Sequence, residues 1–193
     1  MNQSSSKLIS LMTEKGMPSR LEGNFFSGLL VADQGDFDAG IAMMHQAFNL
    51  LHRWGDEEEA PYKLALLGEA YRNAGKTQQG LRCVEEALSQ VDRTGERWYE
   101  AELHRIKGKL FLSLSVPDQR PAEDSFLKAI EVAQAQEAKS WELRAAMSLS
   151  RLWRDQGKRA QARDLLAPIH AWFTEGFDTA DLEDARALLD ELG

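Results

Sequence analysis

The sequence is poor in the features that mark secreted, membrane-spanning and nucleic-acid-binding proteins. Its single cysteine, Cys83, cannot form a disulfide within the chain. No stretch approaches the roughly 18 consecutive apolar residues that a transmembrane helix needs. Basic residues are scarce as well, since 23 Lys and Arg stand against 31 Asp and Glu and the net charge is -8. Because nucleic-acid binding relies on cationic contacts to phosphates, we expect neither a nucleic-acid partner nor a membrane partner.

The pattern of a secretory leader is also missing. Residues 1–7 are polar and serine-rich, and no apolar segment follows a basic start. We therefore expect a cytoplasmic protein. Cys83 falls on the apolar side of a predicted helix, which is typical of a small buried side chain and not of a reactive thiol.

Helical periodicity is what the chain has in abundance. Apolar residues recur at positions i, i+3, i+4 and i+7 along nearly its whole length, and no run alternates with period two for long enough to indicate a strand. The pattern predicts an all-α fold. We predict ten antiparallel helices, at residues 5–15, 20–34, 37–53, 57–74, 77–93, 97–115, 119–137, 139–156, 159–173 and 179–192.

Three glycines divide this pattern at regular intervals. Gly35, Gly75 and Gly157 each lie between two apolar helical segments, with separations of 40 and 82 residues. Each is followed five positions later by a small residue, namely Gly40, Gly80 and Ala162. One helix-turn-helix unit therefore recurs about every 41 residues, which indicates a repeat array forming one elongated domain.

The residues of each unit match the tetratricopeptide (TPR) pattern, in which small side chains let two helices pack closely. The second unit shows the match most completely, with Leu64, Leu67, Gly68, Tyr71, Ala74, Gly75, Gly80, Val84 and Ala87. The third unit fits only if its turn is about two residues longer. We predict one TPR-like, right-handed α-solenoid over residues 1–193. Its parts are an N-terminal half-repeat or cap at 1–18, repeats at 19–55, 56–95, 96–138 and 139–174, and a capping helix at 175–193.

A more specific resemblance lies in the segments Gly95–Leu103, Leu143–Ala146 with Leu152–Gly157, and Trp172–Asp178. They resemble the C-terminal TPR region of large bacterial signalling ATPases, many of which also carry an adenylate or guanylate cyclase domain or a DNA-binding domain. The resemblance implies a sensing or scaffolding array. This sequence shows no counterpart of the catalytic domains, so the resemblance implies no ATPase or cyclase activity.

One short motif resembles a phosphate-binding loop. Ala70–Thr77 satisfies the relaxed pattern of Ala or Gly, four residues and Gly-Lys-Thr. Phosphate binding needs a flexible loop that leaves a strand, so that backbone amides surround the phosphates. Here residues 70–74 continue an amphipathic helix, and Gly75 occupies the turn position of the repeat. A nucleotide-binding enzyme acting through Gly75, Lys76 and Thr77 is therefore the remote alternative.

No other motif predicts a catalytic centre, a cofactor site or a metal site. The four histidines are His45, His52, His104 and His170, and only the first two share a predicted helix face. A metal site needs three or four converging ligands, and no third one is near that pair in sequence. We predict a protein that is not an enzyme. Among the large aromatics, we expect Trp153 and Trp172 in the core and regard Trp98 and Trp141 as candidates for outward contacts.

The candidate binding site is the concave face, which the first helix of each TPR unit lines. Aligning the units places nine side chains there: Tyr62, Glu69, Asn73, Glu102, Arg105, Lys109, Arg144, Arg151 and Asp155. A groove with Arg105, Lys109, Arg144 and Arg151 suits an acidic peptide, because guanidinium groups bind carboxylates in pairs. Two alternatives stay open, a solvated helix face or a face covered by the acidic final helix, since seven of residues 174–193 are acidic.

These observations favour a non-enzymatic protein–protein interaction module or scaffold that binds a partner segment in its groove. The alternative is a detached sensor or regulatory subunit that docks onto a signalling ATPase or a nucleotide cyclase. The oligomeric state is open, because the amphipathic segment at residues 7–15 is either a cap or an incomplete repeat that associates with another chain.

Overall fold

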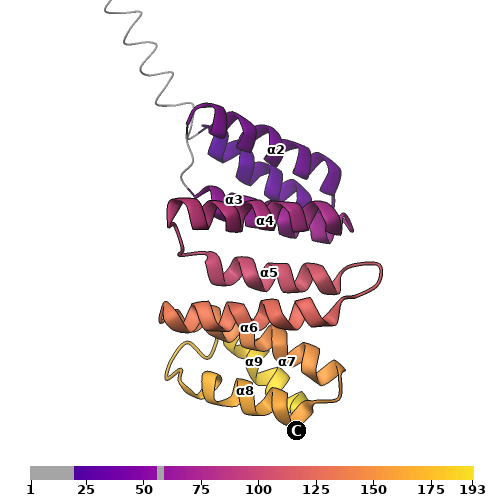
Figure 1. Ribbon diagram of the computed structural model, residues 1–193, viewed down its shortest axis with the longest axis vertical. Helices are drawn as coiled ribbons and strands as arrows, with labels where there is room; N and C mark the ends of the chain where they lie inside the picture. Colours follow the sequence, from indigo (N-terminus) through magenta and orange to yellow (C-terminus); the bar gives the residue numbers. More distant parts are fainter. Residues whose placement is uncertain (1–19, 56–58) are drawn as a thin grey trace, which may run out of the picture. The chain divides into compact units, whose positions relative to one another are not determined.

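The computed structural model describes residues 20–55 and 59–193, which form helices joined by short connections (Figure 1). Residues 20–33 are helical. The helices that follow are α2 (Phe37–Arg53), α3 (Ala60–Asn73), α4 (Thr77–Thr94), α5 (Glu100–Leu112), α6 (Gln119–Ala135), α7 (Lys139–Asp155), α8 (Arg159–Ala171) and α9 (Ala180–Leu192). These ranges contain no strand, which confirms the predicted all-α class. The helix predicted at 5–15 lies outside the described residues.

The three glycines of the repeat end helices, as their spacing predicts. Gly75 has φ +70° and its amide donates to the carbonyl of Arg72 at 3.0 Å, while the amide of Lys76 donates to Tyr71 at 2.9 Å. This pair of bonds is a Schellman motif, which satisfies carbonyls that would otherwise be left open at a helix end. The same two bonds close the helices before Gly35 and Gly157.

The end of α6 has this geometry without a glycine. The amide of Glu137 donates to Gln134 at 3.1 Å and that of Ala138 to Ala133 at 2.9 Å, with Glu137 at φ 55°. A side chain in this left-handed conformation is strained by contact between its Cβ and the backbone. Because the sequence offers no glycine here, only the length of the apolar pattern predicted the helix end.

Close contact between helix backbones explains two of the glycines inside helices. A Cβ atom at Gly40 would lie 2.5 Å from the amide nitrogen of Ala32 and 2.6 Å from the carbonyl oxygen of Gly28. The helix at residues 20–33 and α2 therefore touch through their main chains. Gly108 in α5 has a different neighbour, because its Cβ would lie 2.4 Å from the ring of Phe126 in α6.

The chain divides into two compact units, residues 1–83 and 84–193, with the boundary inside α4. In the first unit, α2 packs on α3, and Phe25, Met44 and Leu67 are completely buried. In the second, α6 packs on α5 and α7, α7 packs on α8, and α9 contacts both α7 and α8. Its core gathers apolar side chains from α6 to α9, including Leu182 and Leu188 of the final helix. The predicted repeat boundaries stay predictions.

Among the described helices, α5 differs most from its predicted range. It runs from Glu100 to Leu112, three residues shorter at each end than the predicted 97–115. The chain then turns back, and the amide of Asp118 donates to the carbonyl of Phe111 at 3.1 Å. Six residues connect α5 to α6, against three between α3 and α4, so the expected longer turn of the third unit is confirmed.

None of the described helices is long and apolar enough to span a bilayer.

Candidate functional site

Arginines of α7 face acidic side chains of α9. Three ion pairs join the two helices: Arg144 with Asp181, Arg151 with Asp184, and Arg154 with Glu191. The Nε of Arg144 lies 2.6 Å from Oδ2 of Asp181, whereas the guanidinium of Arg151 lies 3.4 Å from Oδ2 of Asp184. The acidic final helix thus lies against arginines of α7, as in the alternative of a face covered by that helix. The Arg151 pair is long and exposed, so its contribution to stability is small.

Arg105 differs from the other predicted cations. Its Nε donates to Oε2 of Glu102 at 2.6 Å, and a second bond joins its terminal nitrogen to Oε1. Only 8% of Arg105 and 3% of Glu102 is exposed. A two-bond contact between buried partners holds the guanidinium against its own helix. Glu102 therefore orients the guanidinium of Arg105 and neutralises its charge.

A polar cavity of about 210 Å³ lies among α5, α7 and α9. It brings together four of the predicted groove residues from two helices. Its lining consists of Arg105, Lys109, Arg144, Met147, Ser148, Arg151, Asp181 and Asp184. We call it the polar cavity. Cations from α5 and α7 stand opposite carboxylates from α9, so the wall is of mixed charge.

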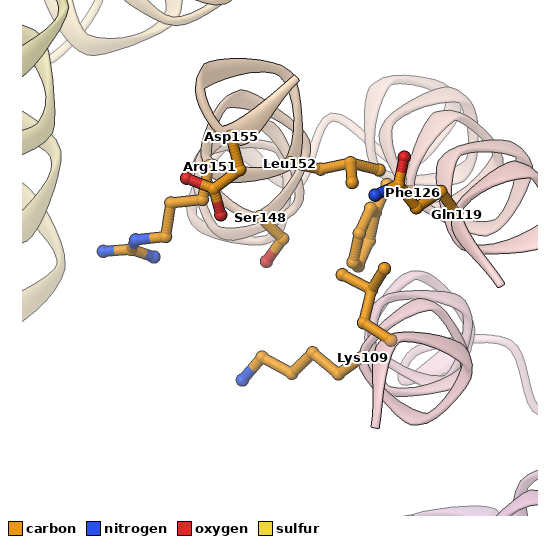
Figure 2. Close-up of a pocket in the computed structure, with 8 residues that line it drawn as sticks. Lys109, Gln119, Phe126, Ser148, Arg151, Leu152 and Asp155 are labelled. Carbon is orange, nitrogen blue, oxygen red and sulfur yellow. The ribbon is translucent and has the colours of Figure 1, made fainter. Parts of the chain in front are cut away.

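A second cavity of about 290 Å³ adjoins it, among α5, α6 and α7 (Figure 2). We call it the amphipathic cavity. Its lining is Lys109, Leu112, Gln119, Phe126, Ser148, Arg151, Leu152 and Asp155. Figure 2 shows Phe126 and Leu152 together on one side, with the polar ends of Lys109 and Arg151 on the other. Lys109, Ser148 and Arg151 line both cavities and form their common wall.

The lining of the amphipathic cavity carries two cations, Lys109 and Arg151, and one carboxylate, Asp155. Nε of Arg154 lies 3.0 Å from Oδ1 of Asp155, and this hydrogen bond is the main cause that raises the pKa of Arg154 above its usual value. Arg154 lines neither cavity and bonds to Glu191 as well as to Asp155. A ligand in the amphipathic cavity would therefore meet one more cation than carboxylates.

The predicted residues of the first unit lie elsewhere. Glu69 and Asn73 line a cavity of about 170 Å³ together with apolar side chains that include Leu29 and Leu66. Tyr62 is half-buried on α3. The nine predicted side chains are therefore distributed over the two units, and the groove that joins them stays a prediction.

The segment that resembles a phosphate-binding loop is the end of one helix and the start of the next. The amides of Gly75 and Lys76 donate to helix carbonyls, so they are not directed at a ligand. The Lys76 ammonium bonds to Asp38, which is the main cause that raises the pKa of Lys76. Thr77 is buried, with 7% exposed. The amides of Gly75 and Lys76 therefore do not form the open loop that holds phosphates.

The described histidines form no metal site, and the tryptophans differ in exposure. Throughout the described ranges, no group of three or more His, Cys, Asp or Glu side chains could hold a metal ion. The prediction that Trp172 lies in the core is wrong, because it is 58% exposed and its ring faces the ammonium of Lys139 at 5.7 Å. Trp98 is exposed, as expected of a candidate for outward contacts. Trp141 is half-buried beside Ala101 and Ala133.

Sequence reasoning missed Leu112, Gln119 and Phe126 of the amphipathic cavity. The signal available for Phe126 was Gly108, a glycine inside a helix that needs a packing partner. The ring of Phe126 is that partner. Gln119 gives no comparable signal, since it begins α6 and belongs to no periodic stripe.

Comparison with known proteins shows which fold this architecture resembles. No protein-family model matches the chain. A solved structure of nearly identical TPR-like repeats from a candidate kinesin light chain of Podospora anserina superposes with a TM-score of 0.69 at 16% identity, covering 91% of this chain and 86% of that one. A variant of the same protein gives 0.70 at 16% identity, covering 91% and 85%. The fold is TPR-like.

One relative found by sequence is a much longer protein. A stretch of 128 residues, 66% of this chain, is 28% identical to a protein of Rhizobium meliloti that is described only as uncharacterized. The match covers 12% of the relative, so this TPR-like chain corresponds to a small part of that protein's length.

Proposed function

We propose that this chain is a non-enzymatic interaction module or scaffold that binds a segment of a partner protein on the α5–α7 surface of its second unit. The observation that carries the proposal is the meeting of two cavities at Lys109, Ser148 and Arg151. One cavity is polar and the other has an apolar side, which suits a segment with both kinds of side chain. The TPR-like fold supports a protein as the partner.

The cations favour an acidic partner segment. Arg151 is 41% exposed at its side chain and Asp184 is 68% exposed, with 3.4 Å between their charged atoms. Exposed pairs of this kind contribute about 0–1 kcal/mol. A carboxylate of the partner can therefore replace Asp184 at little cost, and it gains the second cation, Lys109, in the same wall. We retain the remaining predicted groove residues as contacts of a longer segment.

Affinity capture from a lysate tests the proposal with two charge-reversal variants. The site variant combines Lys109→Glu with Arg151→Glu. The control combines Arg159→Glu with Arg163→Glu, two exposed residues of α8 that line neither cavity and change the net charge equally. Arg105 stays unchanged, because Glu at that buried position would face Glu102 without a counter-ion.

The outcome is decided by comparison of the two variants, after circular dichroism has established that both are helical. The proposal predicts that a protein retained by the wild type is retained by the control and lost by the site variant. Equal retention by all three chains would move the contact to another face. Loss from both variants would show a dependence on net charge alone.

A second candidate is a detached sensor or regulatory subunit of a signalling ATPase or a nucleotide cyclase. It is favoured by the match to 12% of a much longer protein, which suggests that a segment of this kind works beside other domains. Its test is the identity of the captured protein. A captured protein with an ATPase or cyclase domain, whose turnover changes when the chain is added, would support it, and unchanged turnover would exclude it for that protein.

We propose a cytoplasmic location and no cofactor or catalysis for either candidate. Nucleotide binding at Gly75, Lys76 and Thr77 has the least support, because the amides of Gly75 and Lys76 complete a helix end.

A further inference from the structure

The apolar side of the amphipathic cavity is formed by side chains that the core holds in place. Leu152 is 4% exposed and Phe126 is 1% exposed, so both are fixed by the core of the second unit. The absence of a side chain at Gly108 allows the ring of Phe126 to rest on α5. Three helices therefore position the cavity wall, and neither residue has a polar group that needs a partner.

The opposite side presents cations to the same space. Arg151 and Lys109 come from different helices, α7 and α5, and Figure 2 shows both side chains extending past Ser148. The only acidic lining residue, Asp155, is bonded to Arg154. A guanidinium and an ammonium beside an apolar wall match an anionic head group joined to an apolar tail.

We propose that the amphipathic cavity binds a small amphipathic carboxylate. The carboxylate bonds to Arg151 and Lys109, and the tail lies against Leu112, Phe126 and Leu152. The volume of about 290 Å³ is near the lower end of ligand pockets, roughly 300–1,000 Å³, which limits the ligand to a short tail. This site goes beyond protein binding, and because Arg151 and Lys109 serve both, its ligand would compete with the acidic partner segment.

Titration with defined probes tests this proposal on the full chain. The probes are butanoate, hexanoate and octanoate, with 1-butanol, 1-hexanol and 1-octanol as uncharged counterparts of the same tail length. Binding is followed by chemical-shift changes of the backbone amides of α5, α6 and α7. We expect affinity to rise about three- to fourfold per added methylene until the cavity is full. Each carboxylate should bind about tenfold or more tightly than its alcohol.

Two variants separate the head-group contact from the tail contact. Lys109→Gln with Arg151→Gln should remove the preference for carboxylate over alcohol while the dependence on tail length remains. Ser148→Met should abolish binding of every probe, because the larger side chain fills the cavity. The hydroxyl that is lost bonds to the carbonyl of Arg144 within its own helix. Arg159→Gln with Arg163→Gln is the matched control and should bind as the wild type does.

Three results would overturn the proposal. The first is no saturable shift with any carboxylate. The second is equal affinity for a carboxylate and its alcohol, and the third is unchanged binding in a folded Ser148→Met chain. If Ser148→Met does not fold, the wild-type tail series and the double Gln variant decide the question. The proposed protein-binding function is tested separately by capture and does not depend on these results.

Discussion

At the scale of single residues, Gly40 is a position where a side chain has no room. A Cβ there would lie 2.5–2.7 Å from atoms of Ala32 and Gly28, most of them main-chain atoms that cannot rotate away. Gly40→Ala gains about 1 kcal/mol of helix propensity, but the overlap costs more. We expect the free energy of unfolding in urea to fall by about 1–3 kcal/mol.

The control for this substitution is Gly23→Ala in the preceding helix. Gly23 is exposed, and a Cβ built on it meets nothing within 4 Å. Its replacement should therefore raise the free energy of unfolding by up to about 1 kcal/mol. Similar effects at Gly23 and Gly40 would contradict the close main-chain contact.

Glu137 has a backbone conformation that is unfavourable for a residue with a side chain. It ends α6 at φ 55°, a conformation that costs most residues about 1–2 kcal/mol and that glycine adopts freely. Allowing for the extra entropy of glycine in the unfolded chain, we expect Glu137→Gly to stabilise the second unit by about 0.5–1 kcal/mol. Thermal unfolding measures the change. Gly157→Ala at the equivalent turn should destabilise by a similar amount, and effects of equal sign would refute the explanation.

His104 gives the stability of the second unit a dependence on pH. Burial is the main cause that lowers its pKa, with Lys107 and Lys128 adding to the shift and Glu100 and Glu131 opposing it. The unfolded chain therefore binds a proton more readily than the folded one. The contribution of His104 is fully present above pH about 6.5 and declines as the pH falls below that value.

The substitution His104→Gln removes this titration. Urea unfolding at pH 7.5 and at about pH 5 should show a smaller loss of stability on acidification in the variant than in the wild type. An identical loss in both chains would show that His104 does not cause it.

At the scale of elements, α9 is held by apolar packing and by ion pairs of unequal strength. The Arg144–Asp181 pair is short at 2.6 Å and about one third of each side chain is exposed, whereas the Arg151–Asp184 pair is longer and more exposed. We expect a coupling energy of about 0.5–1 kcal/mol for the first pair at low salt and near zero for the second.

Double-mutant cycles with Ala measure these energies. The cycle is needed because Arg144 also lies over the ring of Trp141 at 5.1 Å, so Arg144→Ala alone removes two contacts. The Arg144–Asp181 coupling should decrease at 0.5 M salt, where screening is strong. A larger coupling energy for Arg151 with Asp184 than for Arg144 with Asp181 would contradict the proposal that a partner carboxylate replaces Asp184 at little cost.

The elements also show what a sequence can and cannot predict. Helix periodicity and the turn glycines Gly35, Gly75 and Gly157 are local signals, and they located the helices closely. The pairing of Arg105 with Glu102 is local too, since the two are three residues apart on one helix, but its burial depends on the neighbouring helices. The exposure of Trp172 depends on where the connection to α9 leaves it, which periodicity does not encode.

The candidate site could be predicted only in part from the sequence. Arg151 and Lys109 were predicted from the alignment of repeats, because equivalent positions of stacked helices face one surface. The apolar wall was not, since Phe126 comes from a second helix, α6, that the repeat pattern assigns to the outer layer. A cavity is a property of three helices at once, and no single stretch of sequence contains it.

At the scale of the whole molecule, the described chain forms two units, and both cavities of the candidate site belong to the second. A TPR-like fold narrows the class of function but does not choose the surface that performs it. The central claim is that a partner protein contacts the wall formed by Lys109, Ser148 and Arg151.

Site-specific photo-crosslinking tests that claim most directly. A photoreactive amino acid replaces Gln119, an exposed lining residue of the amphipathic cavity, in one chain and Arg163, on the exposed side of α8, in another, so that Lys109 and Arg151 are unchanged. After irradiation in a lysate, the account predicts a discrete crosslinked protein from position 119 and none of the same mass from position 163. The same crosslinked protein from position 163 alone would contradict the account, because it would place the partner on α8, away from both cavities.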